Sequence, residues 1–356
     1  MNRFTWSLKG RIRWFPVKLN DARINRQWKA SGERFLVVRH AARQPYFYRQ
    51  FLEFVAGNYP ELRRLFELRL LPCRLHDPSK YVLQIPWIQD PLEDWSPRGY
   101  RQAWRLQRDC VRHGVPIVNR VDCHKNASKL EGARRIALAG FRTPRMAPIA
   151  DVQHFRNTLC GLELPLLVRE NHGHGGTSFL VRSSADIAEI PWHKYRCPLA
   201  VEFIDVSSPR DGAFRRYRFF TGGDIGISQT VQISLGWEAR RRTRVASNLA
   251  DDEEYEYVTT PNPHREQFLE AREFLGLDLV AFDYSYDREG NIVVWEANPY
   301  PFVALSPLKN RVHAPWLTAR TFAVMLSCYL QKAGLTLPDG LREFAKGQTN
   351  TLAMAA

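Results

Sequence analysis

Strand-length apolar runs alternate with longer segments of helical periodicity over the first third of this chain. The pattern predicts three strands, at Glu33–Arg39, Tyr81–Ile85 and Val115–Asn119, and two helices, at Tyr46–Tyr59 and Pro97–His113. Strands that alternate with helices in this way are typical of a small parallel α/β unit. Residues 1–30 show no clear period, so we expect them to form an irregular lead-in.

The remainder of the chain predicts a second, larger arrangement of strands and helices. Helices are expected at Ala127–Ala139, Pro263–Leu275 and Trp316–Ala333, and strands with glycine-containing turns within Leu164–Val206 and Tyr217–Ser234. We therefore expect an N-terminal domain at residues 1–114 and a second domain at residues 115–333. The second domain should divide into subdomains 115–205 and 206–333, and residues 334–356 should form a loose tail.

Acidic and amide side chains stand at one face of a predicted hairpin near the end of the second domain. The segment 279–298 predicts two strands joined by a turn at Asp287–Asn291. Glu296 and Asn298 share one face of the second strand, because strand side chains alternate with a period of two. Asp283 should lie beside them on the first strand. Two carboxylates and an amide oxygen form a ligand set that suits Mg²⁺ bound to nucleotide phosphates; the alternative is an ordinary hairpin with polar residues facing water.

A glycine-rich segment follows the predicted strand that ends at Arg169. Gly173, Gly175 and Gly176 could bring backbone N–H groups close to a phosphate, although a tight hairpin turn explains the same residues. Walker A and dinucleotide-binding motifs are absent, because no Gly-Lys-Ser/Thr sequence follows and the loop leads into a strand. The pair His172 and His174 does not indicate a metal site, since no third ligand lies nearby in the sequence.

The charge of the chain indicates an anionic partner. The 356 residues contain 51 Lys and Arg against 37 Asp and Glu, a net charge of +14. A nucleotide, an acidic substrate, nucleic acid or a membrane surface would each fit, and so would Arg used generally on solvated faces. Arg215, Arg216 and the run Arg240–Arg244 make a nucleic-acid-binding protein one alternative, but no nucleic-acid-binding motif accompanies them.

Neither the cysteines nor the apolar segments point to secretion or to a membrane. The six cysteines are isolated in sequence, which argues against a metal-binding or redox pair and fits a reducing cytosol. The first 16 residues lack the apolar run of a signal peptide, and Trp316–Leu330 is too short and too polar to span a bilayer. We therefore expect a soluble, cytoplasmic protein without a membrane partner.

Six motifs in this order resemble those of the ATP-grasp superfamily, nearest to ribosomal-protein glutamate ligases and D-alanine–D-alanine ligases. The motifs are Val115-Pro-Ile-Val-Asn119, Lys129 at the start of a helix followed by Ala-Gly-Phe-Arg-Thr-Pro144, Leu-Pro-Leu-Leu-Val-Arg169 with its glycine loop, Ala-Val-Glu-Phe-Ile-Asp205, Arg-Tyr-Arg-Phe-Phe-Thr-Gly-Gly223, and Asp283 with Glu296-Ala-Asn298-Pro. The resemblance covers roughly residues 115–310. It implies an α/β (α+β) ATP-grasp fold, with residues 1–114 in the place of the N-terminal pre-ATP-grasp α/β domain.

The resemblance also implies a role for individual residues. Lys129 would contact phosphate, and Arg169 stands where the family usually has a second lysine. Gly173, Gly175 and Gly176 match the lid over the phosphates. Arg218 matches the catalytic arginine that steadies the transferred γ-phosphoryl group, and Arg216 stands where the family often has an acid. The remaining matches are Glu202, Phe203 and Ile204 for the hinge that binds adenine, Asp205 for the ribose, and Asp283, Glu296 and Asn298 for Mg²⁺, with Mn²⁺ as a possible substitute.

The function implied is an ATP-dependent carboxylate–amine ligase that forms an amide through an acyl phosphate and releases ADP. The positive charge favours an anionic small molecule or peptide as substrate. An ATP-grasp kinase that phosphorylates a hydroxyl group is the first alternative, and a nucleic-acid-binding protein is the second. The sequence leaves the identity of the substrates and the oligomeric state open, and a dimer is compatible with it.

Overall fold

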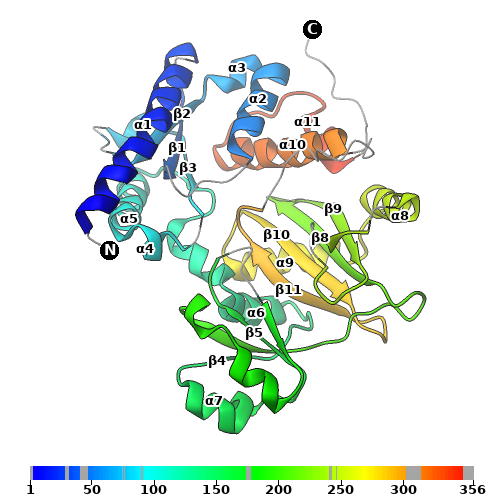
Figure 1. Cartoon of the computed structure of the whole chain (residues 1–356). Helices are drawn as coiled ribbons and strands as arrows, with labels where there is room; N and C mark the ends of the chain where they lie inside the picture. Colours follow the sequence, from blue (N-terminus) through cyan, green and yellow to red (C-terminus); the bar gives the residue numbers. More distant parts are fainter. Residues whose placement is uncertain are drawn as a thin grey trace. The chain divides into compact units, whose positions relative to one another are not determined.

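The computed structural model describes residues 3–28, 32–40, 47–73, 75, 77–89, 91–173, 178–239, 243–245, 247–301 and 314–347 (Figure 1). The chain divides into two compact units. The first unit contains Met1–Asp122 and Tyr300–Ala356, and the second contains Cys123–Pro299. Among the described residues, no helix combines the length and the apolar character needed to cross a membrane.

The first unit is built on a three-stranded parallel sheet. Its strands β1 (Phe35–His40), β2 (Phe66–Leu71) and β3 (Leu83–Trp87) are arranged in the order β2-β1-β3. The central strand β1 is buried along its whole length, as is typical of a parallel strand covered on both faces. A parallel sheet is present here, as predicted, but the predicted strand Val115–Asn119 is wrong. That segment contributes only an isolated bridge between Ile117 and Gln84, and the third strand is β2, which was not predicted. The helices of this unit are α1 (Arg3–Gln27), α2 (Tyr48–Asn58), α3 (Pro60–Arg63), α4 (Leu92–Trp95), α5 (Pro97–Arg112), α10 (Ala314–Lys332) and α11 (Leu341–Lys346), with a 3₁₀ turn at Pro78–Lys80.

The two ends of the chain depart from the sequence-based expectations. The predicted irregular lead-in is wrong, because residues 3–27 form helix α1. Asn25 of α1 bonds to both backbone groups of Leu68, donating to its carbonyl oxygen at 2.9 Å and accepting from its N–H at 3.0 Å. This side chain satisfies part of the open edge of β2. The predicted loose tail is wrong at α11, where Leu341 and Phe344 are buried.

Helix α10 packs within the first unit, so the observed units differ from the expected domain boundaries. Phe51 of α2 contacts the rings of Phe322 and Tyr329 of α10 edge-on, at centroid distances of 5.7 Å each. The indole N–H of Trp87 donates to the Tyr329 hydroxyl at 2.9 Å. Ile117 also bridges to Gln84 of β3, which places the segment after residue 114 in the same unit. Aromatic packing therefore groups α10 with residues of the N-terminal third.

The second unit contains two four-stranded antiparallel sheets. One has the strand order β4-β7-β5-β6, and the other has the order β11-β10-β8-β9. The strands are β4 (Met146–Pro148), β5 (Leu166–Glu170), β6 (Ser178–Val181), β7 (Pro198–Glu202), β8 (Phe214–Gly222), β9 (Ile225–Ser234), β10 (Leu279–Tyr286) and β11 (Ile292–Asn298). The helices are α6 (Lys129–Leu138), α7 (Val152–Thr158), α8 (Asn248–Thr259) and α9 (Arg265–Leu275), with 3₁₀ segments at Val121–Ala127, Leu159–Gly161, Ser184–Glu189 and Trp192–Lys194.

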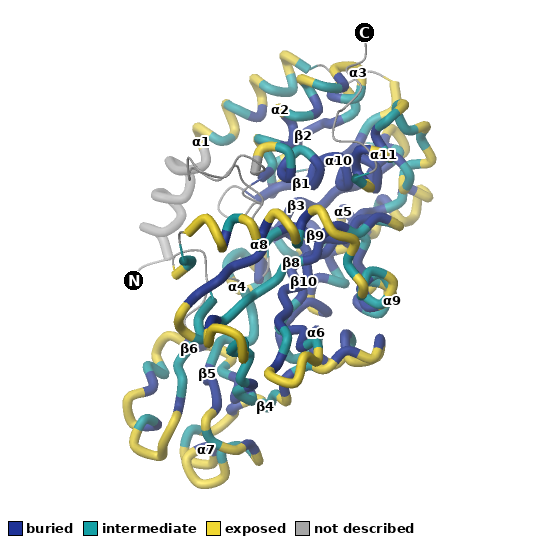
Figure 2. Tube along the Cα trace, turned by 90° about the vertical axis from the view of Figure 1, so that its right-hand side faces the viewer, coloured by how far each residue is buried: buried dark blue, intermediate teal, exposed yellow. Residues whose placement is uncertain are grey.

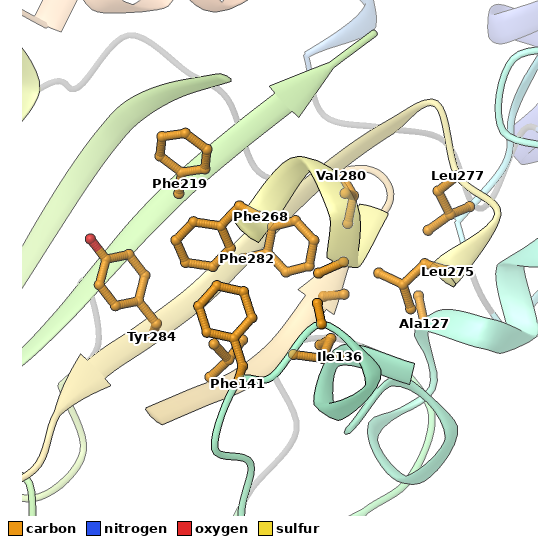
Figure 3. Close-up of a cluster of buried hydrophobic side chains, with 14 residues drawn as sticks. Ala127, Ile136, Phe141, Phe219, Phe268, Leu275, Leu277, Val280, Phe282 and Tyr284 are labelled. Atoms are coloured by element: carbon orange, nitrogen blue, oxygen red, sulfur yellow. The ribbon is translucent and has the colours of Figure 1, made fainter. Parts of the chain in front are cut away.

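An aromatic core fills one face of the β8–β10–β11 sheet (Figure 3). Phe268 of α9 lies 4.9 Å from Phe219 and 5.1 Å from Phe282, measured between ring centroids. Ile136 of α6 belongs to the same buried cluster. Because side chains alternate along a strand, burying Phe219 and Phe282 turns their neighbours toward the opposite face. That opposite face carries the candidate site.

The burial pattern follows this arrangement (Figure 2). Strand β10 is buried from Leu279 to Ser285, whereas helix α8 exposes Leu249 and Tyr255. In the other sheet, Leu166 and Val168 of β5 belong to the core cluster that also contains Phe155 of α7. The neighbouring residues of β5 therefore point to the other face of that sheet.

Candidate active site

In the second unit, we call the sheet β4-β7-β5-β6 the first sheet and the sheet β11-β10-β8-β9 the second sheet. Three charged side chains lie in one row across the second sheet. Asp283 of β10 is directly opposite Arg218 of β8 on one side and Glu296 of β11 on the other. Side chains at directly paired positions lie on the same face of a sheet and can touch. Asn298 follows Glu296 by two residues and is paired with Ala281, so it lies on this face as well. Asp283, Glu296 and Asn298 therefore share one face of the sheet, as expected from the hairpin, and their binding of a metal ion stays a prediction.

Arginine side chains neutralise both carboxylates. Arg218 donates to both oxygens of Asp283, through Nε at 2.6 Å and Nη2 at 2.9 Å, and the side chain of Asp283 is only 2% exposed. Arg216 approaches the same carboxylate at 3.7 Å. Arg169 of β5 reaches Glu296 from the first sheet at 3.1 Å. The two sheets of the second unit are therefore linked by an ion pair at the candidate site.

The pairing with Asp283 also favours the charged form of Arg218. Burial alone would lower the pKa of this guanidinium, but the negative charge and the hydrogen bonds of Asp283 outweigh burial and raise the pKa. The backbone carbonyl of Arg218 accepts a hydrogen bond of 2.9 Å from the Tyr257 hydroxyl of α8. Arg218 is thus a permanently charged group that is fixed through both its side chain and its backbone.

The glycine-rich segment is attached to the start of helix α6. Lys129, the first residue of α6, is 7% exposed, and its Nζ donates to the carbonyl oxygen of Gly173 at 2.8 Å. Asn171 accepts a hydrogen bond of 3.1 Å from the N–H of Leu130, and its carbonyl accepts one from the N–H of Lys129. Gly173 has a φ of +78°, a conformation that favours glycine. Gly175 and Gly176 lie outside the described residues.

Asn171 acts as a remote cap for helix α6, a role that no local sequence pattern indicates. Its side chain satisfies one of the N–H groups that every helix leaves unpaired in its first turn. We expect Asn171→Ala to lower the free energy of unfolding by about 1 kcal/mol, the usual cost of losing such a cap. Urea denaturation measures this value. Asn157→Ala, on the exposed side of α7, is the control and should change stability by less.

The end of β7 is bonded within its own sheet, and the segment after it reaches the other sheet of the second unit. Glu202 and Arg145 form two hydrogen bonds of 2.9 Å, one between backbone groups and one from the Arg145 N–H to the Glu202 carboxylate. Asp205 accepts from the N–H of Ser207 at 2.9 Å and pairs with Arg288 at 3.4 Å. Arg288 belongs to the turn between β10 and β11, so Asp205 is tied to the hairpin that carries Asp283 and Glu296.

Apolar side chains cluster next to this segment, on the face of the first sheet opposite the core cluster of Leu166 and Val168. Leu167 of β5 and Val201 of β7 are its buried centre, and Phe203 packs against it. Trp237, from the segment after β9, joins the same cluster, which also includes Leu130, Met146, Leu180 and Leu199. Ile204 is buried next to Phe203 in sequence. Phe203 and Ile204 were expected, from the family resemblance, in the hinge that binds adenine. No local pattern indicates Trp237, which is 36 residues away from Val201 in the printed sequence.

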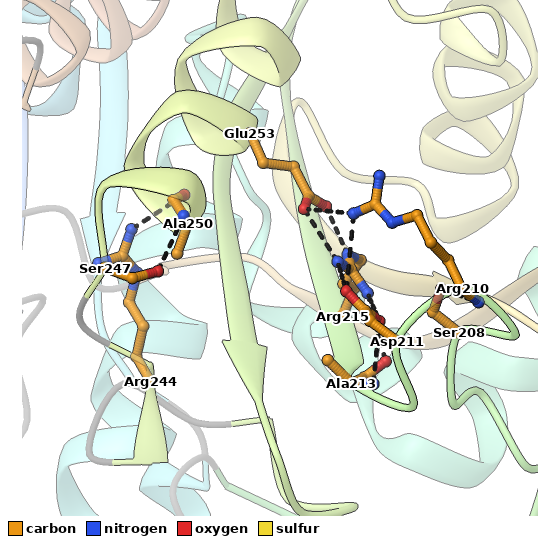
Figure 4. Close-up of polar contacts among 9 residues, drawn as sticks. All are labelled: Ser208, Arg210, Asp211, Ala213, Arg215, Arg244, Ser247, Ala250 and Glu253. Carbon is orange, nitrogen blue, oxygen red and sulfur yellow. Dashed lines mark hydrogen bonds and ion pairs between the residues drawn. The ribbon is translucent and has the colours of Figure 1, made fainter.

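Two of the arginines that suggested a nucleic-acid surface are held by carboxylates instead. Arg215 binds Asp211 at 2.7 Å and Glu253 of α8 (Figure 4). Arg244 binds Asp251 at 2.7 Å and the buried Glu254 at 3.1 Å. Arg240, Arg241 and Arg242 lie outside the described residues. Within the described residues, Arg215 and Arg244 therefore do not contribute unpaired charge to a basic surface.

The site offers oxygen donors suited to a hard cation. Asp283 and Glu296 supply carboxylates, and Asn298 supplies an amide oxygen, the ligand types that Mg²⁺ prefers. In the described part of the chain, no group of three or more His, Cys, Asp or Glu residues is placed to hold a metal ion. His172 belongs to no such group, and His174 lies outside the described residues.

Comparison with known proteins identifies the fold. No protein-family model and no curated protein sequence matches the chain. Among solved structures, the ATP-grasp ligase PsnB in complex with a minimal precursor has a TM-score of 0.51 and 12% identity, over 83% of this chain and 100% of PsnB. D-alanine–D-alanine ligase from Bacillus anthracis has a TM-score of 0.52 and 12% identity, over 85% and 99%. The macrocyclase MdnC from Microcystis aeruginosa, bound with precursor peptide MdnA, has a TM-score of 0.53 and 10% identity, over 81% and 98%. The chain therefore has the ATP-grasp fold.

Proposed function

We propose that this protein is an ATP-dependent carboxylate–amine ligase that acts on an anionic small molecule or peptide. The ATP-grasp fold supports the class of enzyme, and the row formed by Arg218, Asp283 and Glu296 supports the chemistry. Arginines and carboxylates brought together on a sheet face that is not filled by the core provide the charges that phosphoryl transfer requires. This row is the observation that carries the proposal.

We propose that the nucleotide phosphates are held by Lys129, Arg169 and the glycine segment that begins at Gly173. The positive charge of Arg169 would offset the negative charge of the phosphates, and its planar guanidinium can bind two phosphate oxygens at once. The adenine would bind against the backbone of residues 202–204 and the apolar surface around Leu167, and Asp205 would contact the ribose. Gly175 and Gly176 complete this assignment from the sequence.

Asp283, Glu296 and Asn298 would hold Mg²⁺ or Mn²⁺ in this proposal, and the cation would supply positive charge to the phosphate oxygens. For these carboxylates to accept a cation, Arg218 and Arg169 must exchange their present partners for the phosphate groups. Arg218 would then stabilise the γ-phosphoryl group as it moves. In this proposal, the ion pairs seen in the protein would keep Arg218 and Arg169 close to the phosphates until the nucleotide binds.

The proposed reaction has two steps. An oxygen of the substrate carboxylate attacks the γ-phosphorus, the bond between that phosphorus and the β–γ bridging oxygen breaks, and ADP leaves. The nitrogen of the amine substrate then attacks the acyl carbon, phosphate leaves with the electrons of the C–O bond, and the amine loses a proton. The solved structures of PsnB and MdnC contain a precursor or precursor peptide, which supports a peptide as one possible substrate class for this chain.

The test is ADP formation in the presence of ATP and Mg²⁺ with pools of carboxylates and amines, including acidic peptides. Mass spectrometry of the product separates the ligase from the kinase alternative, because a ligase yields an amide and a kinase yields a phosphorylated acceptor. Isothermal titration calorimetry with a non-hydrolysable ATP analogue tests the nucleotide site independently of the substrates. Absence of both nucleotide binding and ADP formation would refute the proposal.

Lys129→Ala should weaken the binding of ATP by at least about tenfold, because it removes a cation expected to contact phosphate. The substitution also removes the hydrogen bond to Gly173, so a lower melting temperature is expected as well. Calorimetry with the ATP analogue measures the affinity. Arg134→Ala, an exposed residue of the same helix α6, is the matched control and should leave the affinity unchanged.

A further inference from the structure

Helix α5 of the first unit carries a row of five exposed arginines that the proposed active site does not use. Arg98, Arg101, Arg105, Arg108 and Arg112 follow one another at intervals of three and four residues, and all five are exposed. This spacing places them on a single face of a helix, opposite the buried face. The row extends over about 21 Å, from the rise of an α-helix. We call it the α5 arginine stripe.

The charge of the α5 arginine stripe is barely offset by the protein itself. Among the described residues, only Arg112 of the stripe forms an ion pair, with Asp109 at 3.6 Å. Like charges three and four residues apart repel each other and weaken a helix. The other side of α5 buries Ala103, Leu106 and Cys110, so packing fixes the direction in which the arginines point. The helix therefore keeps an unfavourable charge pattern on a rigid, exposed face.

We propose that the α5 arginine stripe binds an acidic segment of the enzyme's peptide substrate. The proposal rests on the proposed function, because it assigns a peptide to that ligase. Carboxylates on alternate residues of an extended peptide lie about 6.8 Å apart on one side of the chain. Arginines in neighbouring turns of α5 are separated by about 5 Å along the helix axis. A flexible acidic peptide can therefore pair with several arginines in succession, each guanidinium donating two N–H groups to the oxygens of one carboxylate.

The surroundings of the stripe favour a peptide over nucleic acid. Proteins that bind single strands combine a basic surface with exposed aromatic side chains on which bases stack. The aromatic residues of α5, Tyr100 and Trp104, pack against the core of the first unit instead. Among the large hydrophobic side chains of α5, only Val111 is exposed, at 49%. An aliphatic side chain beside the arginines suits a peptide better than a base.

The experiment measures peptide binding without ATP. A fluorescein-labelled oligoglutamate peptide long enough to span the stripe is titrated with the full-length protein, and anisotropy is followed at low and at physiological salt. The variant replaces Arg98, Arg101, Arg105 and Arg108 with Gln. The matched control replaces the exposed arginines Arg26, Arg64, Arg156 and Arg182 with Gln, which removes the same charge from scattered positions.

We expect the stripe variant to bind the peptide at least about tenfold more weakly and the control to stay within about twofold of the parent protein. The melting temperature of the stripe variant should be unchanged or higher, because the substitutions relieve repulsion within α5. Equal loss of affinity in both variants would overturn the proposal and indicate attraction to net charge alone. Tighter binding of a labelled single-stranded RNA, lost in the stripe variant, would overturn it in favour of nucleic acid.

Nucleotide binding separates this proposal from the proposed function. Calorimetry with the ATP analogue should give the same affinity for the parent protein and the stripe variant, since none of the four arginines belongs to the candidate active site. A parent protein that binds the peptide but no nucleotide would refute the ligase and leave the peptide surface standing. A parent protein that binds nucleotide but shows no stripe-dependent peptide binding would refute only the α5 arginine stripe.

Discussion

Arg218→Met should be the most damaging single substitution in the candidate active site. It keeps the bulk of the side chain but leaves the carboxylate of Asp283, which is 2% exposed, without its bidentate partner. Removing one member of a buried ion pair costs about 3 kcal/mol or more, because the remaining charge stays buried. Turnover should fall by at least about 100-fold, as when a group that stabilises transition-state charge is removed. Urea denaturation and a steady-state ADP assay measure the two effects.

A double variant separates stability from chemistry. Adding Asp283→Asn to Arg218→Met removes the uncompensated charge, so most of the lost stability should return while activity stays low. Arg210→Met is the control for removing an arginine from an ion pair. The side chain of Arg210 is 73% exposed, so its pairs with Asp211 and Glu253 should contribute little to stability. A single Arg218→Met variant as stable as the parent protein would show that Asp283 does not depend on this arginine.

Glu296→Gln should lower the nucleotide-dependent activity by at least about 100-fold while changing the volume of the side chain very little. The substitution removes one of the two carboxylates proposed to hold Mg²⁺. Stability without nucleotide should change by less than about 1 kcal/mol, because Gln can still accept a hydrogen bond from Arg169 and the pair is partly exposed. Asp283 is paired with Arg218 and Glu296 with Arg169, so repulsion between the two carboxylates should contribute little to the stability of the protein without nucleotide.

The measurement for Glu296→Gln is ADP release over a range of Mg²⁺ and Mn²⁺ concentrations, together with thermal denaturation without nucleotide. Glu289→Gln, in the exposed turn of the same hairpin, is the matched control. Near-normal activity of Glu296→Gln at saturating Mg²⁺ would contradict the metal assignment. A large loss of stability without nucleotide would show that the ion pair to Arg169 is structurally more important than the proposed metal site.

The local parts of the candidate site were accessible from the sequence. The alternation of Glu296 and Asn298 on one strand fixed their common face, and the turn after Tyr286 placed Asp283 beside them. Lys129 and Arg169 were proposed from the resemblance to ATP-grasp proteins, and the structure finds both beside other members of the predicted set. Period and turn chemistry act over a few residues, which is why these features could be predicted.

Long-range contacts could not be predicted in the same way. The ion pair between Arg169 and Glu296 spans 127 residues, and no local pattern reports it. In sequence, Asn171 looks like an ordinary loop residue, and it caps α6 only because that helix begins beside it in the fold. Helix α1 was missed because its apolar residues show no period and it contains Pro16. Tertiary contacts such as the pairing of Asn25 with Leu68 supply what the local sequence lacks.

The packing of α10 has a consequence for the synthesis of the protein. Trp87 and Phe51 leave the ribosome early, but the Tyr329 and Phe322 side chains that cover them are made after the whole second unit. The aromatic surface of the nascent first unit stays uncovered throughout that interval, which is a condition for chaperone binding or aggregation. A chain truncated before α10 should therefore associate with chaperones and precipitate even though the second unit is intact.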